Sequence, residues 1–408
     1  MESPICRRSV TAPFHARLAC LLLISGVASV AAPQLERSDL FVAGERGFAL
    51  YRIPGIVVTA KGSVLAYCEA RKNSGADWGE IEVHLRRSTD GGRKWAPPHQ
   101  IGHLGPRLPR NPVALAKKSG GISDQTVNNP VAIADAQSGI VHFLYCVEYM
   151  RCFYLRSDDD GATWSKPVEI TATFDQFRPE YDWKVIATGP GHGIQLRNGR
   201  LIVPVWLSTS RTSPHGPAVS STIYSDDHGR TWHRGEIAVP EELGPSEAAA
   251  VELGDGRVML NVRNHSPTGR RLSVFSRDGA TGWSAPQFHE PLTEPVCMAG
   301  LARWPAREAD KPVRILFSNP ASGTRERRNL TVRLSEDDGR TWPVSRSLEP
   351  GPSAYSDLAV LRDGTILCFY ERGREALKPG AKPSPYGTLT LARFNHEWLA
   401  ARDESGRR

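Results

Sequence analysis

Cysteine, histidine and acidic side chains carry most metal and redox chemistry, and this chain contains all of them without the spacing that such chemistry needs. Its 408 residues include seven cysteines and twelve histidines, but no Cys-x-x-Cys pair, no His-Glu-x-x-His motif and no dense cluster of His, Asp and Glu. Protein zinc sites depend on spacings of this kind. The sequence therefore predicts neither a metal centre nor a cofactor.

The cysteines also argue against a disulfide framework. Five of them follow residue 32, namely Cys68, Cys146, Cys152, Cys297 and Cys368, and most lie in apolar, strand-like runs. An odd and sparse set does not resemble the even, dense pattern of disulfide-rich domains. A pair across a turn between Cys146 and Cys152 is open, but we expect buried free thiols.

One pattern of polar residues recurs along the chain, Ser-x-Asp-x-Gly-x-x-Trp. Each copy follows a β-rich run, which indicates a hairpin turn in which Asp accepts backbone hydrogen bonds, Gly adopts a positive φ and Trp packs between strands. Turn geometry and packing explain these residue types without a ligand, so the motif indicates the fold and not the chemistry. Intact copies begin at Ser88, Ser157, Ser225 and Ser335, and a degenerate copy begins at Ser276.

The repeat spacing predicts the architecture. The copies begin 51 to 69 residues apart, so the 376 residues after position 32 hold about six units. Helical periodicity is scarce, while 37 glycines and 31 prolines punctuate short apolar runs, which favours an all-β fold. We therefore predict a six-bladed β-propeller of four-stranded antiparallel blades with these turns at its hairpins. A β-sandwich with decorated hairpins is the alternative.

The N-terminal segment has the composition of a targeting sequence. Arg7, Arg8 and Arg17 precede an apolar run from Leu18 to Ala32 that ends in small residues. This pattern is typical of a signal peptide, and the run is shorter than the roughly 20 apolar residues of a membrane-spanning helix. We expect residues 1–32 to be a signal peptide, residues 33–408 to be a single propeller domain, and the mature protein to be secreted or periplasmic with no membrane span.

Net charge narrows the class of partner only slightly. The formal charge is +7 for the whole chain and +5 without residues 1–32. A mild positive field suits anionic partners without naming one, and no nucleic-acid-binding motif accompanies it. We expect no nucleic-acid partner and, with no feature that fixes an oligomeric state, a monomer.

The repeat, together with Tyr51-Arg52-Ile53-Pro54, resembles the sialidase (neuraminidase) family. In that family the turn repeat is called the Asp box, and the first blade carries an Arg-Ile-Pro motif. The resemblance extends over nearly all of residues 40–398. It implies a glycoside hydrolase, an exo-α-sialidase that removes terminal α-linked sialic acid from glycoproteins, glycolipids or oligosaccharides, so the expected partner is a sialylated glycan.

The resemblance also implies three arginines that bind the substrate carboxylate. Arginine suits this task because its planar fork binds a carboxylate bidentately and keeps its charge. The matching residues are Arg52, Arg263 in Asn-Val-Arg-Asn, and Arg327 in Arg-Arg-Asn-Leu-Thr. Arg328 is the alternative to Arg327, but strand alternation should point it to the opposite face.

The nucleophile implied by the resemblance is Tyr355, in Gly-Pro-Ser-Ala-Tyr-Ser-Asp. A neutral phenol avoids the repulsion that a carboxylate nucleophile would meet at a carbon already bearing a carboxylate, and sialidases are known exceptions among retaining glycosidases for this reason. Because an ordinary tyrosine has a pKa near 10, it needs a base within reach. That base is Glu247, with Glu252 as the alternative.

The remaining expected roles also follow from the family. Asp77, after the Glu-Ala-Arg motif that ends at Arg71, is the expected acid that protonates the leaving oxygen and later activates water, with Glu80 as the alternative. Arg71 is expected to reach a sugar hydroxyl. Glu371 is expected to orient Arg52. Trp206 or Trp183 is a candidate to contact the N-acyl group of the sugar, although large aromatic side chains are more often part of the core.

Two other functions use the same residues. An intramolecular hydroxyl or another sugar can replace water, which would make the chain an anhydro-forming sialidase or a trans-sialidase. A propeller that only binds glycans would keep the Asp boxes and lose residues such as Tyr355 and Asp77. Both are present, which favours an enzyme.

Overall fold

The computed structural model describes residues 1, 32–73, 75–304, 313–375 and 383–401, and its folded unit begins at Ala32. The predicted signal peptide falls almost wholly outside the described residues. No helix in the described part of the chain is long and apolar enough to cross a membrane.

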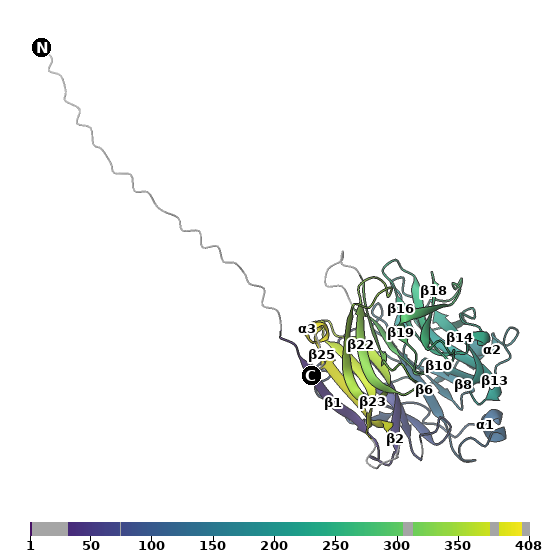
Figure 1. Ribbon diagram of the computed structural model, residues 1–408. Helices are drawn as coiled ribbons and strands as arrows, with labels where there is room; N and C mark the ends of the chain where they lie inside the picture. The colour runs from purple at the N-terminus through teal and green to yellow at the C-terminus, as the bar shows by residue number, and fades with distance from the viewer. Residues whose placement is uncertain (2–31, 74, 305–312, 376–382, 402–408) are drawn as a thin grey trace. The chain divides into compact units, whose positions relative to one another are not determined.

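Short apolar runs between glycines and prolines form antiparallel sheets of four or five strands (Figure 1). One sheet orders β2 (Leu50–Val58), β3 (Val64–Arg71), β4 (Ile81–Ser88) and β5 (His99–Gln100). Another orders β11 (Gly191–His192), which runs parallel to its neighbour, β6 (Val127–Ala134), β7 (Val141–Val147), β8 (Arg151–Ser157) and β9 (Val168–Glu169). A third orders β10 (Val185–Thr188), β13 (Leu201–Ser213), β14 (Gly216–Ser225) and β15 (His233–Arg234), with β12 (Ile194–Gln195) also on β13. A fourth orders β16 (Pro245–Glu252), β17 (Val258–Asn264), β18 (Arg270–Ser276) and β19 (Gln287–Thr293).

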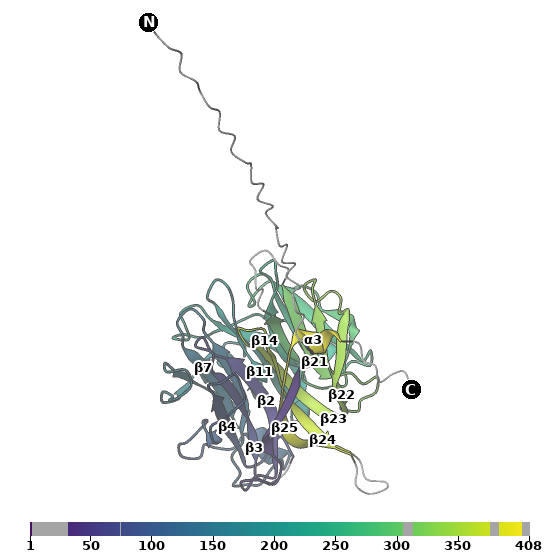
Figure 2. The ribbon, with the colours of Figure 1, turned by 90° about the vertical axis from the view of Figure 1, so that its left-hand side faces the viewer.

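The remaining strands form one seven-stranded sheet, part of which is seen in Figure 2. Its order is β1 (Leu35–Val42), β25 (Ser384–Phe394), β24 (Ile366–Arg374), β23 (Val344–Val360), β22 (Arg328–Ser335), β21 (Arg314–Pro320) and β20 (Gly300–Trp304). The connections include α1 (Pro112–Ala116), α2 (Thr171–Asp175), α3 (His396–Ala400) and the 3₁₀ helix η1 (Glu241–Leu243).

The sheet count differs from the predicted six separate four-stranded blades, because the described strands form five sheets. The cause is β23, which is 17 residues long. Its first half pairs with β22, up to Pro352, and its second half pairs with β24, from Ser353 onward. One continuous strand therefore joins what the repeat spacing predicts as two sheets.

The inner strands of successive sheets contact one another in a closed series. β2 contacts β6, β6 contacts β10 and β12, β13 contacts β16, β16 contacts β20, β20 contacts β23, and β23 returns to β2. The first described strand, β1, pairs with the last, β25. This arrangement is all-β and propeller-like, as predicted, and differs from a two-layer sandwich.

The repeated turns have the predicted geometry. At Ser225, the hydroxyl oxygen accepts a hydrogen bond from the backbone N–H of Gly229 at 2.9 Å, and Asp227 accepts one from Thr231 N–H at 2.9 Å. Gly229 has a φ of +79°, which glycine adopts without strain. Trp232 is buried against Tyr154, with ring centroids 5.7 Å apart.

The five described cysteines are free and buried, so the prediction of free thiols is confirmed. Cys146 and Cys152 do face each other across β7 and β8, yet they form no disulfide.

A buried ion pair connects three inner strands. Asp357 on β23 accepts a hydrogen bond from the backbone N–H of Ile56 on β2 at 2.9 Å, and its other carboxylate oxygen lies 2.8 Å from Nδ1 of His192 on β11. Burial alone would lower the pKa of His192, but the Asp357 carboxylate outweighs burial and raises it.

This pair should make part of the stability pH-dependent. Because the folded-state pKa of His192 exceeds the unfolded value near 6.5, the pair contributes fully below about pH 6.5, and the contribution is lost as pH rises through the folded pKa. We expect His192→Asn to lower the urea unfolding midpoint more at pH 5.5 than at pH 8.5. A difference that stays constant or grows with pH would contradict this account.

Candidate active site

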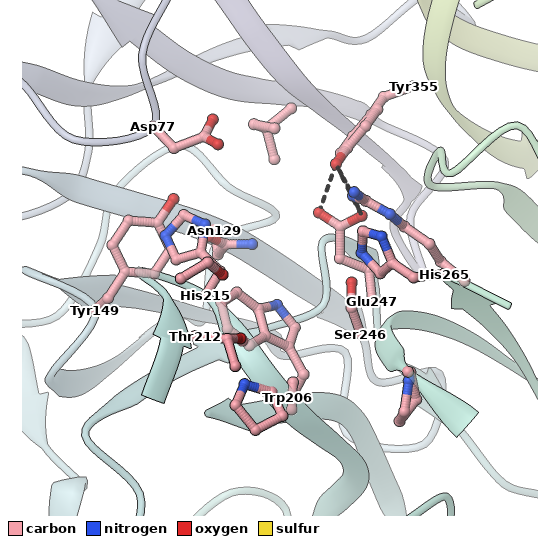
Figure 3. A pocket seen from close by; sticks show the side chains of 18 of the residues that line it. Asp77, Asn129, Tyr149, Trp206, Thr212, His215, Ser246, Glu247, His265 and Tyr355 are labelled. Atoms are coloured by element: carbon pink, nitrogen blue, oxygen red, sulfur yellow. Dashed lines mark hydrogen bonds and ion pairs between the residues drawn. The ribbon is translucent and has the colours of Figure 1, made fainter. Parts of the chain in front are cut away.

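A cavity of about 480 Å³ collects side chains from every sheet, or from the connections beside them (Figure 3). Six of the eight predicted site residues line it. These are Arg52, Asp77, Glu247, Arg263, Arg327 and Tyr355. The other two, Arg71 and Glu371, are buried and contact the lining residues from behind.

Irregular strand pairing accompanies these side chains. Strand register shifts where β2 carries Arg52, where β16 carries Glu247 and where β23 carries Tyr355. An extra residue at such a bulge bends the strand and re-aims its side chains, and bulges are common beside active sites.

Tyr355, Glu247 and Arg263 form a compact hydrogen-bonded group. The Tyr355 hydroxyl lies 2.7 and 2.8 Å from the two oxygens of Glu247. One terminal nitrogen of Arg263 donates to the Tyr355 oxygen at 2.6 Å and to Glu247 at 2.5 Å. Burial, with Glu247 beside it, raises the pKa of Tyr355 well above its usual value even though three arginines oppose the shift. The phenol therefore holds its proton at neutral pH, with a carboxylate in place to accept it.

The three arginines surround the tyrosine ring. The guanidinium carbons of Arg52 and Arg327 lie 5.2 and 5.3 Å from the ring centroid of Tyr355. Among the described residues, one terminal nitrogen of Arg52 and Nε of Arg263 are buried without a hydrogen-bond partner. Buried donors of this kind are normally satisfied, so the protein itself leaves part of the hydrogen-bonding capacity of these two guanidinium groups unused.

The structure places Arg327 at the cavity and Arg328 outside it. Arg327 donates to the Tyr386 hydroxyl at 2.9 Å and to the carbonyl oxygen of Val296 at 2.7 Å. The Arg328 side chain is 42% exposed and pairs with Glu375 at 3.3 Å.

We expect these neighbouring arginines to respond differently to the same substitution. Arg327→Lys should raise KM for the sialoside substrate that the sequence predicts by roughly 10-fold or more, because a lysine cannot reproduce a bidentate fork. Arg328→Lys should leave KM within about twofold, because exposed ion pairs contribute little. Steady-state kinetics of both variants measures this, and equal effects would contradict the placement.

Glu371 connects the first arginine to the tyrosine strand. One of its oxygens accepts from Arg52 Nε at 3.0 Å and from the backbone N–H of Ile53 at 3.1 Å. The other accepts from the backbone N–H of Tyr355 at 3.0 Å. Glu371 thereby fixes two sides of the cavity at once.

Asp77 lies across the cavity from Tyr355 and Glu247 (Figure 3). It lies 3.0 Å from Arg71 and 3.5 Å from Arg52, and its side chain is 46% exposed. Burial of the carboxyl favours a higher pKa, but Arg71 and Arg52 outweigh it and hold the pKa of Asp77 well below its usual range. Solvent contact weakens this effect.

The alternative acids lie elsewhere in the described chain. Glu252 contacts Arg197 at 3.1 Å, and Glu80 contacts Arg107 at 2.9 Å. Neither belongs to the cavity lining. Of the two tryptophans considered, Trp206 lines the cavity, whereas Trp183 packs in a hydrophobic cluster between sheets.

Several lining residues were not anticipated from the sequence. They include Asn129, Tyr149, His215 and His265. Tyr149 has a φ of +49°, unusual for a bulky residue and frequent at functional sites, but nothing in the sequence around it signals this. Among the described residues, no group of three or more His, Cys, Asp or Glu side chains is arranged to hold a metal ion.

Comparison with known proteins gives the family. A family profile described as a BNR repeat-like domain matches residues 110–368, more than half of the chain. A sialidase of Micromonospora viridifaciens is 33% identical over 389 residues. The chain belongs to the BNR-repeat sialidase family. A second sialidase relative, from Bacteroides fragilis, is 31% identical over 347 residues.

Coverage of these sialidases is uneven. The matches include 90% and 81% of this chain, but only 55% and 61% of the two relatives. The chain thus spans little more than half the length of each.

Solved sialidase structures share the fold. The Hadza microbial sialidase Hz136 has a TM-score of 0.70 at 28% identity, over 89% of this chain and 69% of that one. The intramolecular trans-sialidase of Ruminococcus gnavus has a TM-score of 0.71 at 20% identity, over 90% and 99%.

Proposed function

We propose that this chain is a retaining exo-α-sialidase that hydrolyses terminal α-linked sialic acid from glycans. The observation that carries the proposal is the Tyr355 hydroxyl held between Glu247 and Arg263, on the opposite side of the cavity from Asp77. Sialidase relatives from bacteria support it.

The arginines explain why the ligand should be a sugar acid. Arg52, Arg263 and Arg327 all line a cavity whose nucleophile candidate is a neutral phenol. A sugar that bears a carboxylate on its anomeric carbon could pair with these guanidinium groups and place that carbon near the tyrosine oxygen.

The proposed reaction has two steps. In the first, Asp77 donates a proton to the leaving glycosidic oxygen while the Tyr355 oxygen bonds to the anomeric carbon and its phenolic proton passes to Glu247. In the second, Asp77 takes a proton from water, the water oxygen displaces the tyrosine, and Glu247 returns the proton to Tyr355. Two displacements retain the anomeric configuration.

The low pKa of Asp77 fits this scheme once substrate is considered. Arg52 and Arg71 stabilise the ionised form of Asp77 in the empty cavity. A substrate carboxylate bound to Arg52 would offset that positive charge and raise the pKa of Asp77. Substrate binding would thus prepare the acid for protonation.

Release of sialic acid from a fluorogenic sialoside by the mature protein tests the proposal. Mass spectrometry of the product distinguishes free sialic acid from an anhydro-sugar or a transferred residue. Free sialic acid supports hydrolysis. An anhydro-sugar or a transferred residue would show that the chain catalyses one of the alternative reactions and not hydrolysis. If the folded protein turns over no sialoside, the proposed enzymatic function is wrong.

Three points of organisation belong to the same proposal. Residues 1–32 act as a signal peptide, so the enzyme works outside the cytoplasm. Residues 33–408 form a single catalytic domain. The seven-stranded sheet joins through β23 the strands that the repeat spacing predicts as two sheets. N-terminal sequencing of exported protein would test the first point.

A further inference from the structure

The segment that carries Asp77 leaves its own sheet. It connects β3 to β4, and the backbone N–H and carbonyl of its Gly79 bond to the Thr126 hydroxyl at 3.1 and 2.9 Å. The Arg71 guanidinium holds the segment at a second point, because it donates to the carbonyl oxygens of Gly75 and Ala76 at 2.6 and 3.0 Å. Asp77 lies between these two attachments, facing the cavity.

The next residue, Trp78, is only 4% exposed and does not belong to the cavity lining. Its indole lies 4.7 Å from the Tyr149 ring and 5.8 Å from the His215 ring, nearly parallel to the latter. Trp206 completes the group, 5.5 Å from His215. We call Tyr149, Trp206 and His215 the aromatic box.

The residues of the aromatic box come from different sheets than the β3–β4 segment that carries Trp78. Tyr149 lies in the turn between β7 and β8, Trp206 lies on β13, and His215 lies in the turn between β13 and β14. All three line the cavity, whereas the indole of Trp78 lies behind them. Its Nε1 has no hydrogen-bond partner among the residues that the structure describes, so packing is the observed attachment of the indole.

We propose that Trp78 is the positioning residue of the catalytic acid. Its indole packs in the aromatic box and thereby holds the neighbouring backbone in the position from which Asp77 faces the cavity. This inference rests on the proposed function. Packing of the Trp78 indole against Tyr149 and His215 holds the backbone next to Asp77, so Asp77 stays presented to the substrate. The aromatic box thus contributes to protonation of the leaving group through Trp78.

The leaving group supplies the test. A sugar alkoxide needs a proton to depart, whereas 4-nitrophenolate does not, so an acid-positioning defect should slow sialyllactose hydrolysis selectively. We expect Trp78→Ala to lower kcat/KM for sialyllactose by about 10- to 100-fold and for 4-nitrophenyl sialoside by less than about threefold. Asp77→Ala sets the upper limit of this selectivity, and Trp78→Phe should recover much of the loss.

Trp232→Ala is the matched control. Trp232 is also buried, and its Nε1 has no partner in the described part of the chain, but it belongs to an Asp box on another sheet. Its removal should cost stability while leaving the ratio of the two kcat/KM values within about twofold of wild type.

An unchanged ratio in Trp78→Ala would overturn the proposal, as would an equal loss on both substrates. If Trp78→Ala does not fold, His215→Ala removes the ring stacked on the indole and should shift the ratio in the same direction; no shift there would overturn the proposal.

Amide hydrogen exchange gives a readout that needs no activity. The amides of residues 75–80 should exchange faster in Trp78→Ala than in Trp232→Ala, with the rest of the chain similar in both. Equal exchange of this segment would overturn the anchoring. If the wild-type protein cleaves neither sialoside, the proposed function fails, while the exchange measurement still decides whether Trp78 anchors the segment.

Discussion

Tyr355→Phe is expected to lower kcat for sialoside hydrolysis by roughly three orders of magnitude or more while the protein stays folded. The substitution removes one oxygen, the atom proposed to bond to the anomeric carbon. The arginines that would bind the substrate carboxylate remain, so KM should change much less than kcat. Initial rates with a fluorogenic sialoside measure both parameters.

Fold integrity should survive this change for a specific reason. Glu247 keeps its ion pair with Arg263 at 2.5 Å after the hydroxyl is removed, so no buried charge loses its partner. The phenylalanine ring can still pack against Arg52 and Arg327, as the tyrosine ring does. Circular dichroism and the thermal midpoint should therefore resemble those of the wild type.

Tyr145→Phe is the matched control. Tyr145 is buried, packs between sheets and does not belong to the cavity lining. This variant should retain wild-type turnover. Near-normal activity in Tyr355→Phe would exclude Tyr355 as the nucleophile, and a comparable loss in Tyr145→Phe would attribute the effect to the fold.

The turns were predictable because their residue types are set locally. Gly229 needs a positive φ, and Ser225 and Asp227 satisfy backbone N–H groups within the same eight residues. The all-β fold follows from repeated turns of this kind. No distant part of the chain has to be known.

The sharing of β23 was not predictable in the same way. The strand contains Gly351 and Pro352, residues that usually interrupt strands. Here they lie where pairing passes from β22 to β24, so the strand continues because each half has a different partner. Only the tertiary arrangement decides this.

The cavity residues likewise divide into those that local sequence identifies and those that only the tertiary arrangement brings to the site. Residues in singular motifs, such as Arg52 and Tyr355, were identified from the family resemblance, and strand alternation favoured Arg327 over Arg328. Tyr149 and His215 carry no local signature, because their place at the cavity depends on which sheets meet there. Tyr386, which receives a hydrogen bond from Arg327, was missed for the same reason.

Glu371→Ala is expected to impair stability and turnover together. Glu371 is fully buried and accepts hydrogen bonds from Arg52 and from the backbone N–H groups of Ile53 and Tyr355. Removing one partner of a buried ion pair typically costs about 3–5 kcal/mol, because the other charge stays buried without compensation. Arg52 would then be left with Asp77 as its ion-pair partner, at 3.5 Å, and should turn toward it and away from the substrate carboxylate.

Glu252→Ala separates this effect from the loss of any buried glutamate. Glu252 is also buried, but its partners Arg197 and Arg303 are 51% and 32% exposed and regain water when the carboxylate is removed. We expect that variant to lose about 1 kcal/mol or less and to keep wild-type turnover. Urea unfolding and sialoside kinetics on both variants measure the contrast. If Glu371→Ala were as stable and as active as Glu252→Ala, Arg52 and the backbone at Tyr355 would not depend on Glu371, and the cavity would need another source of its geometry.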